Sequence, residues 1–278
     1  MKVILAEALG MCFGVRDALA IVAGVARPAE TTICGQLVHN PRVLEQLEMR
    51  GFHQVVEGAR GGVPETPAVL VTAHGISDRA RSRLTGAGKQ IIDTTCPLVR
   101  RAHEAARRLE AEGFHVLLIG KRGHVEVQGI VEDLASCDVI CAAAEVRTYP
   151  HSRLGILCQT TVNPATADEI IAHVQLHNPL AELRLVDTIC EPTRRRQRAM
   201  QALVQAVEAV VVVGGSNSNN TAQLAAFCRE HDKPVLQVQA ADELDRAWLA
   251  PFRTVGLTAG TSTLPETIDE VHRALAAM

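Results

Sequence analysis

The chain has 278 residues, of which 47% are hydrophobic, so it can bury a large core. Its 28 basic and 31 acidic residues nearly balance, and only 3% of the residues are aromatic, which argues against nucleic acid as a partner. The apolar run at Val3 to Ala6 is too short for a signal-peptide core, and no run approaches the length of a membrane span. We therefore expect a cytoplasmic protein with no membrane contact.

Strands and helices are expected to alternate along the chain, because short apolar runs are separated by amphipathic stretches with caps and stops. In the first third we expect strands at 3–6, 31–34 and 68–72, a helix at about 15–26, and a helix that Asn40 caps, Pro41 begins and Gly51 ends. Further along we expect a helix at 97–113, strands at 115–120 and 154–158, a helix capped by Asn163, strands at 209–214 and 254–258, and a helix from 265 onward. This alternation predicts parallel sheets, with ligands bound beyond the carboxyl ends of the strands.

A repeated phrase divides the chain into three parts. Asp93-Thr94-Thr95-Cys96-Pro97 returns as Asp187-Thr188-Ile189-Cys190-Glu191-Pro192, and Cys190 lies 94 residues after Cys96. Cys12, which lies 84 residues before Cys96, also stands between an apolar strand and a helical pattern. We therefore predict an α/β fold of three pseudo-equivalent lobes with small parallel sheets, at residues 13–95, 97–189 and 191–278, the last completed by the strand within 1–11.

Cys12, Cys96 and Cys190 are candidate metal ligands, because eight cysteines in a reducing compartment are not expected to form disulfides. Three cysteines with no equivalent fourth suggest a central iron–sulfur cluster with one iron open to substrate. Two alternatives stay open: the cysteines are small buried hydrophobic residues, or they bind zinc with a histidine, although they lack the usual close-spaced pair. The other five, Cys34, Cys137, Cys141, Cys158 and Cys228, are expected in the core.

Polar loops follow the matching strands in each part. His39, His124 and Ser218 each come four residues after a strand-ending glycine, and His74, Thr160 and Ser262 follow the next matching strands. The segment from Gly214 to Thr221 opens a helix with Ser and Asn donors, which favours a phosphate site, although an ordinary capped loop is the alternative. It lacks the Gly-Lys-Ser/Thr ending of a nucleotide-binding loop.

His124 and Glu126 form a second candidate unit. Their two-residue spacing is expected to turn both side chains to the same side of an extended loop, where they could relay a proton. A solvated Glu beside a loop His is the alternative.

Taken together, these segments resemble the 4-hydroxy-3-methylbut-2-enyl diphosphate reductase family over essentially the whole chain. The matching motifs are Cys12-x-Gly14-Val15, Val38-His39-Asn40, Ala73-His74-Gly75, Asp93-x-Thr95-Cys96-Pro97-Leu98-Val99, Gly123-His124-x-Glu126, Gln159-Thr160-Thr161, Ile189-Cys190, Asn217-Ser218-x-Asn220 and Thr258-Ala259-Gly260-x-Ser262. Each motif is short, but the set in this order is specific.

The resemblance implies an oxidoreductase that performs the last step of the non-mevalonate isoprenoid route. It implies a 4Fe-4S cluster on Cys12, Cys96 and Cys190, whose open iron binds the allylic hydroxyl, and it implies Glu126 as proton source with Thr160 near the hydroxyl. The hydroxyl leaves as water after two-electron reduction, which gives isopentenyl and dimethylallyl diphosphates. The residues implied to bind the diphosphate are His39, His74, His124, Ser218, Asn219, Asn220 and Ser262.

Three positions depart from the family pattern and put the rate in doubt more than the reaction. Val125 stands where relatives carry Pro, Asn219 stands where Ser is common, and a run of basic residues follows Cys190. A zinc hydrolase and a non-catalytic iron–sulfur sensor are the rival functions. The motifs do not specify the electron donor. The basic residues Arg194, Arg195, Arg196 and Arg198 suggest a rim that docks an acidic reduced ferredoxin or flavodoxin, with a solvated helix face as the alternative.

Overall fold

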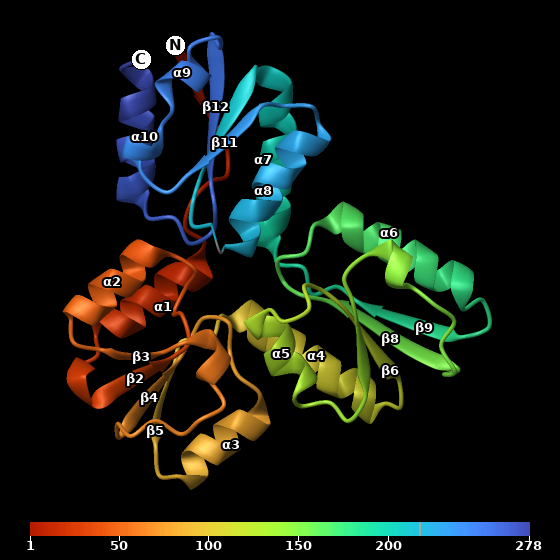
Figure 1. Ribbon diagram of the computed structural model, residues 1–278. Helices are drawn as coiled ribbons and strands as arrows, with labels where there is room; N and C mark the ends of the chain where they lie inside the picture. Colours follow the sequence, from red (N-terminus) through yellow and green to blue (C-terminus); the bar gives the residue numbers. More distant parts are fainter. Residues whose placement is uncertain (217) are drawn as a thin grey trace. The chain divides into compact units, whose positions relative to one another are not determined.

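A computed structural model describes residues 1–216 and 218–278 of the chain (Figure 1). Within these residues the strands form three four-stranded sheets in which every pair of neighbouring strands is parallel, so the predicted α/β class with small parallel sheets is confirmed. The chain divides into two compact units, unit 1 with residues 1–16, 39–43 and 191–278, and unit 2 with residues 17–38 and 44–190. No described helix is both long and apolar enough to cross a membrane.

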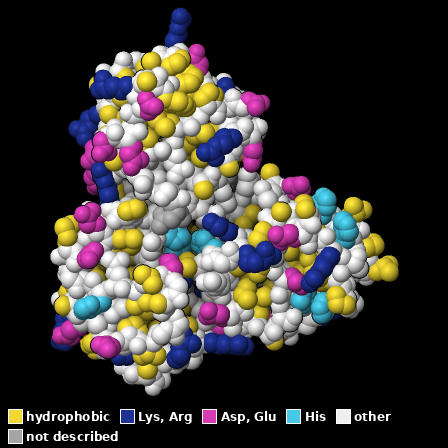
Figure 2. Space-filling view, in the orientation of Figure 1, with side chains coloured by type: hydrophobic (Ala, Val, Ile, Leu, Met, Phe, Trp, Pro, Cys, Tyr) yellow, Lys and Arg dark blue, Asp and Glu magenta, His cyan; other side chains and the backbone are white. Residues whose placement is uncertain are grey.

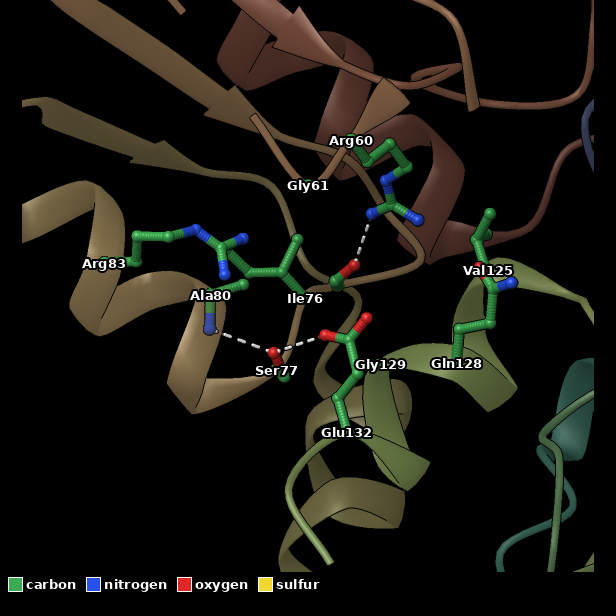
Figure 3. Close-up of a pocket in the computed structure, with 11 residues that line it drawn as sticks. Arg60, Gly61, Ile76, Ser77, Ala80, Arg83, Val125, Gln128, Gly129 and Glu132 are labelled. Carbon is green, nitrogen blue, oxygen red and sulfur yellow. Dashed lines mark hydrogen bonds between the residues drawn. The ribbon is translucent and has the colours of Figure 1, made fainter. Parts of the chain in front are cut away.

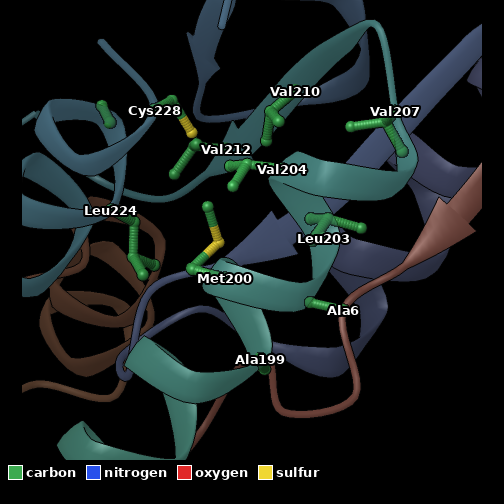
Figure 4. Close-up of a cluster of buried hydrophobic side chains, with 11 residues drawn as sticks. Ala6, Ala199, Met200, Leu203, Val204, Val207, Val210, Val212, Leu224 and Cys228 are labelled. Atoms are coloured by element: carbon green, nitrogen blue, oxygen red, sulfur yellow. The ribbon is translucent and has the colours of Figure 1, made fainter. Parts of the chain in front are cut away.

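Unit 1 is built on the third sheet, in which the N-terminal strand pairs with the last strand of the chain. The strand order is β1 (Lys2–Leu5), β12 (Thr254–Ala259), β10 (Ala209–Val213) and β11 (Val235–Val238). Helices α7 (Glu191–Ala206) and α8 (Asn219–Glu230) cover one face, and α10 (Pro265–Ala276) covers the other. Val210 and Val212 face α7 and α8 (Figure 4), while Val211 and Val213 face α10, as the two-residue period of a strand requires. A short helix, α9 (Arg246–Leu249), precedes β12.

Unit 2 contains the first and second sheets, and we call the parts built on them the first and second subdomains. The first sheet has the order β3 (His53–Val55), β2 (Thr31–Cys34), β4 (Ala68–Val71) and β5 (Gln90–Asp93). The second has the order β7 (Cys137–Ile140), β6 (His115–Ile119), β8 (Arg153–Cys158) and β9 (Glu182–Val186). The helices wholly within unit 2 are α3 (Asp78–Gly86), α4 (Pro97–Ala111), α5 (Val125–Val131) and α6 (Pro164–His177).

Two further helices, α1 (Phe13–Ala23) and α2 (Pro41–Met49), have residues in both units. Short 3-10 helices occupy Pro28–Glu30, Glu57–Ala59, Ala143–Glu145 and Ala241–Glu243. On the face seen in Figure 2, Lys and Arg side chains are interspersed with Asp and Glu rather than gathered in one large basic patch.

The 94-residue repeat of the sequence is a structural repeat. β6 and β10 begin at His115 and Ala209, and α4 and α7 cover the same face of their sheets. A Cβ atom added to Gly155 would lie 2.9 Å from Leu109, and one added to Gly256 would lie 2.9 Å from Leu203. Leu203 follows Leu109 by 94 residues, so in both sheets the same helix position packs directly on a strand glycine. The lobe boundaries predicted from the sequence remain a prediction.

The expected elements are present with small shifts, and several elements were missed. The helix expected at 15–26 runs from Phe13 to Ala23 and stops before Gly24, whose lack of a side chain favours termination. The missed elements are β3, β7, β11, α3, α5 and α9.

Candidate functional site

Each of the three candidate cysteines is fixed through its backbone in the same way. The Cys N–H donates to the carbonyl of the residue that lies two positions beyond the end of a central strand. The three bonds are Cys12 to Thr261 (3.2 Å), after β12; Cys96 to Ala73 (3.1 Å), after β4; and Cys190 to Thr160 (2.9 Å), after β8. The first lies in unit 1 and the other two lie in unit 2.

A second anchor lies two residues before each cysteine, at the last residue of the same strand. Thr94 donates its N–H (3.0 Å) and its hydroxyl (2.7 Å) to the Val71 carbonyl. The Thr188 hydroxyl donates to the Cys158 carbonyl at 2.5 Å. These bonds explain the threonine of the repeated phrase.

Gly10 takes the place of this threonine before Cys12, and its N–H donates to the Ala259 carbonyl at 3.1 Å. Its φ of +71° lies in the region that favours glycine. A Cβ there would lie 2.6 Å from the Ile268 side chain. A threonine is therefore disfavoured at this position.

The aspartate of the repeated phrase forms a local turn in both copies. Asp93 accepts the N–H of Thr95 at 2.9 Å, and Asp187 accepts the N–H of Ile189 at 3.2 Å. Burial of Asp93 opposes its ionisation, but the Thr95 hydrogen bonds and the Arg81 guanidinium outweigh it and lower the pKa of this carboxyl.

The cysteines have the donor chemistry that an iron–sulfur cluster needs. All three are partly exposed and directly precede helices α1, α4 and α7, so each thiol stands at the start of a helix. The described residues contain no group of three or more His, Cys, Asp or Glu side chains arranged around one metal ion. A cluster does not require such a group, because each of its cysteines binds a different iron.

The remaining cysteines are only partly as expected. Cys34, Cys158 and Cys228 are buried, as expected. Cys137 is partly exposed but packs against the core of the second sheet, whereas Cys141 is partly exposed, so the expected core place was wrong for Cys141. Cys137 belongs to β7, an edge strand of the second sheet, and Cys141 follows the end of that strand. Edge positions leave one side of the strand uncovered.

Glu126 is a buried carboxyl held by a single residue. It is 1% exposed, and Thr160 donates both its N–H (2.7 Å) and its hydroxyl (3.0 Å) to the two carboxylate oxygens. Burial raises the pKa of Glu126 to about 7, although the hydrogen bonds from Thr160 favour the charged form. Glu126 can therefore hold or release a proton near neutral pH.

His124 and Glu126 lie at the start of a helix, so the expectation of an extended loop was wrong. His124 caps α5, and its Nδ1 accepts the N–H of Glu126 at 3.1 Å, which places the proton of the neutral ring on Nε2. Val125, where the family pattern has Pro, is the buried first residue of this helix. His74 meets His124 edge-on, with ring centroids 5.5 Å apart and an interplanar angle of 87°.

In unit 1, the polar residues form a second group. Ser218 caps α8 by accepting the N–H of Thr221 at 3.3 Å, and Asn220 accepts the N–H of Thr261 at 3.0 Å. Ser262 donates its hydroxyl to the His39 carbonyl at 3.0 Å, and its own carbonyl accepts from the Asn40 amide at 2.6 Å. Asn219 is partly exposed, and Asn217 lies outside the described residues.

Two roles in this group were missed from the sequence. Asn40, expected only as a helix cap, also ties its own turn to the Ser262 loop. The Thr221 hydroxyl closely faces Gly214 and Gly260, so a side chain at either glycine would collide with it. The signal was the Thr-Ala-Gly run at the end of β12, whose glycine indicates a close approach of backbone and side chains.

The basic run after Cys190 does not form a uniform rim. Arg196 is 5% exposed, and its guanidinium donates to the carbonyls of Gly10 and Pro192, so its expected place in a docking rim was wrong. Arg198 is exposed and pairs with Glu191, as the solvated-face alternative requires. Arg195 is exposed and Arg194 is partly exposed.

The model of the family described as LytB protein matches residues 3–276. The chain belongs to the LytB family. This confirms the resemblance found in the sequence.

Curated relatives that match nearly the whole of this chain share one name. A 4-hydroxy-3-methylbut-2-enyl diphosphate reductase of Anaeromyxobacter sp. (strain Fw109-5) is 34% identical over 266 residues, which cover 95% of this chain and 93% of the relative. The enzyme of that name from Aquifex aeolicus is 30% identical over 278 residues, 98% of this chain and 94% of the relative.

Solved structures confirm the fold. The reductase structure from Plasmodium falciparum superposes with a TM-score of 0.89 at 24% identity and covers 98% of this chain and 87% of that one. A structure described as (E)-4-hydroxy-3-methyl-but-2-enyl diphosphate reductase, the terminal enzyme of the non-mevalonate pathway, matches with a TM-score of 0.69 at 29% identity and full coverage of both chains.

The candidate residues of the sequence fall into two sets. Unit 2 brings together Cys96, Cys190, His74, His124, Glu126 and Thr160. Unit 1 brings together Cys12, His39, Ser218, Asn219, Asn220 and Ser262. The role of each of these residues remains a proposal.

Proposed function

We propose that this chain reduces 4-hydroxy-3-methylbut-2-enyl diphosphate to isopentenyl and dimethylallyl diphosphates. Membership of the LytB family and the shared name of the curated relatives support this activity. One observation in the structure carries it: Thr160 gives two hydrogen bonds to the buried acid Glu126, and its carbonyl accepts the N–H of Cys190. A proton source and a candidate metal ligand are thus joined through one residue.

The proposed cofactor is a 4Fe-4S cluster held by Cys12, Cys96 and Cys190, one iron each. When bound, it would relay the two electrons of the external donor one at a time and would offer one iron position without a protein ligand. The matching backbone anchors of the three cysteines support this assignment, because they place each thiol at a strand end and a helix start. The residues therefore fit the donor chemistry of the cluster.

The diphosphate is proposed to bind His39, His74, His124, Ser218, Asn219, Asn220 and Ser262. Hydroxyl, amide and imidazole N–H groups suit phosphate oxygens, and the start of α8 adds backbone N–H groups. Because Nδ1 of His124 accepts the N–H of Glu126, Nε2 carries the hydrogen of the neutral ring and is its donor atom.

Glu126 is proposed to supply the proton that lets the allylic hydroxyl leave as water. Its raised pKa keeps a useful fraction protonated near pH 7, and the Thr160 hydroxyl can pass the proton on. The reaction balances when the allylic alcohol takes up two electrons and two protons and releases one water.

The electron donor is proposed to be reduced ferredoxin or flavodoxin. Because Arg196 is buried, the proposed docking surface after Cys190 is reduced to Arg194, Arg195 and Arg198. Such a surface acts mainly on the association rate and is sensitive to salt.

An anaerobic assay with a reduced viologen dye and the hydroxy diphosphate tests the function. Formation of both five-carbon diphosphates by brown, air-sensitive protein is the expected result. Colourless protein with bound zinc would support a zinc hydrolase, and brown protein without turnover would support an iron–sulfur sensor. Either outcome would overturn the proposal.

A further inference from the structure

Helix α5, which carries Glu126 in its first turn, is fastened to the first subdomain at its other end. Glu132, which follows the helix, accepts the Ser77 hydroxyl at 2.7 Å (Figure 3). The Asp133 carboxylate accepts the N–H groups of Asp78 (2.8 Å) and Arg79 (3.1 Å). These N–H groups open helix α3, so an acidic residue of the second subdomain caps a helix of the first. We call Ser77, Glu132 and Asp133 the α3–α5 clasp.

Between the clasp and the site residues, the two subdomains meet through glycine. A Cβ on Gly129 of α5 would lie 3.6 Å from the backbone of Ile76 in the first subdomain, and one on Gly75 would lie 3.6 Å from the ring of His103 in α4 of the second. His103 is 7% exposed, and burial lowers its pKa, so the ring packs here as a neutral group. A cavity of about 50 Å³ remains, lined in part by Arg60 and Gln128. Helix α5 therefore lies directly against the Gly75–Ile76 turn of the first subdomain.

The clasp lies close in sequence to candidate site residues on both sides. Ser77 comes three residues after His74, and Glu132 comes six residues after Glu126. Because α5 has only seven residues and rises about 1.5 Å per residue, a displacement of its end moves its start as well. The edge-on contact of His74 with His124 spans the same two subdomains.

We propose that Glu132 and Asp133 are positioning residues, which hold α5 against the first subdomain and thereby fix His124 and Glu126 relative to His74. This inference rests on the proposed function, because it gives the clasp a purpose only if these three residues form one site. Nothing in the contacts brings Glu132 or Asp133 to the reacting atoms. They act through the helix.

The central test compares Asp133→Ala, which loses both cap bonds, with Asp133→Asn, which keeps an acceptor. Asp245→Ala is the matched control, since Asp245 caps α9 in unit 1 through the N–H groups of Ala247 and Trp248. The measurements on anaerobically purified holoenzyme are pyrophosphate affinity, melting temperature and the pKa of Glu126. The last is read from the infrared carboxyl band that disappears in Glu126→Gln.

Asp133→Ala is expected to weaken pyrophosphate binding about fivefold, the ratio that corresponds to one helix cap, and to move the pKa of Glu126 downward as water reaches it. Asp133→Asn should recover most of both values. Asp245→Ala should lower the melting temperature but leave both values unchanged.

Wild-type affinity and an unchanged Glu126 pKa in Asp133→Ala would overturn the proposal, whatever the melting temperature. If Asp133→Ala does not fold, Ser77→Ala replaces it, because it removes only the donor to Glu132 and the cap of Ala80. The infrared titration needs neither turnover nor substrate, so it tests the clasp even in a protein without reductase activity. Failure of the clasp and failure of the proposed function can thus be told apart.

Discussion

Asn220 of helix α8 occupies, beside the third sheet, the position that Glu126 of helix α5 occupies beside the second. It follows Glu126 by 94 residues, each is the second residue of its helix, and each accepts a backbone N–H from the loop after a central strand. The same geometry therefore presents a titratable acid in one sheet and a neutral amide in the other. A proton source suits a leaving hydroxyl, and an uncharged amide suits a diphosphate.

Glu126→Gln keeps the shape and the acceptor for Thr160 but removes the acid. Turnover is expected to fall by roughly 100-fold or more, while iron content and pyrophosphate binding survive. In the wild type, the rate should fall as pH rises through about 7, because only protonated Glu126 donates. A pH series of initial rates measures both effects, and wild-type turnover in the variant would refute the role.

The same substitution is expected to stabilise the protein at alkaline pH. The folded-state pKa of Glu126 is about 7 against an ordinary value of 4.5, so the native state favours the neutral form. The contribution of protonated Glu126 to the free energy of unfolding is therefore fully present below pH 4.5. It is lost as the pH rises from 4.5 to about 7, and the total loss is on the order of 3 kcal/mol. Melting temperatures of Glu126→Gln and wild type should therefore diverge in favour of the variant between pH 5 and pH 8. Equal differences at both values would show that the carboxyl is not buried as a neutral acid.

Replacing Cys12, Cys96 or Cys190 by Ser should abolish activity and most bound iron. Cys228→Ser is the matched control, because Cys228 is fully buried in the third-sheet core and burial raises the pKa of its thiol to about 12. Iron analysis after anaerobic purification decides the outcome. Full iron retention in Cys190→Ser would sink the assignment.

Asn220→Ala is expected to weaken pyrophosphate binding by about ten- to a hundredfold, since it removes one hydrogen bond to an anion. It also leaves the Thr261 N–H without its acceptor. Asn220→Asp separates the two effects, because it keeps that acceptor and adds a charge that repels phosphate. Calorimetry should show a loss at least as large for Asp as for Ala, and tighter binding to the Asp variant would contradict the site.

Reversing Arg195 and Arg198 to Glu should slow turnover driven by ferredoxin at low salt and leave turnover driven by a viologen dye unchanged. Arg196 is unsuitable for this test because its buried guanidinium holds the Gly10 carbonyl. Rates with both donors at two salt concentrations measure the effect. Equal losses with both donors, or no loss with either, would reject docking at these residues.

Much of the fold followed from local signals in the sequence. Asn40 and Asn163 cap helices that begin with Pro41 and Pro164, and the four-valine run lies in strand β10, as predicted. The missed strands β3, β7 and β11 are edge strands of three or four residues with several partly exposed positions, so their apolar pattern is weak. Helix α5 was missed because Val125, Val127 and Gly129 are poor helix formers that packing overrides.

The candidate site was predictable in its residue types but not in its environments. The repeated phrase pointed to Cys96 and Cys190, and the backbone anchors explain its threonine. The sequence neighbours of a charged residue do not show whether its side chain is buried. For this reason the sequence left a solvated Glu126 open and predicted Arg196 on a docking rim, whereas both side chains are buried. In both cases the partner that permits burial lies far along the chain, at Thr160 and Gly10.

The backbone anchors of the three cysteines also bear on how the holoprotein is made. Each cysteine is placed by a backbone carbonyl at the end of a sheet, and these hydrogen bonds involve no atom of the cluster. Small zinc domains, by contrast, obtain their folding free energy from the metal itself. The apoprotein should therefore keep its secondary structure, accept iron and sulfide late, after synthesis and folding are complete, and survive repeated loss and rebuilding of its cluster under oxidative stress.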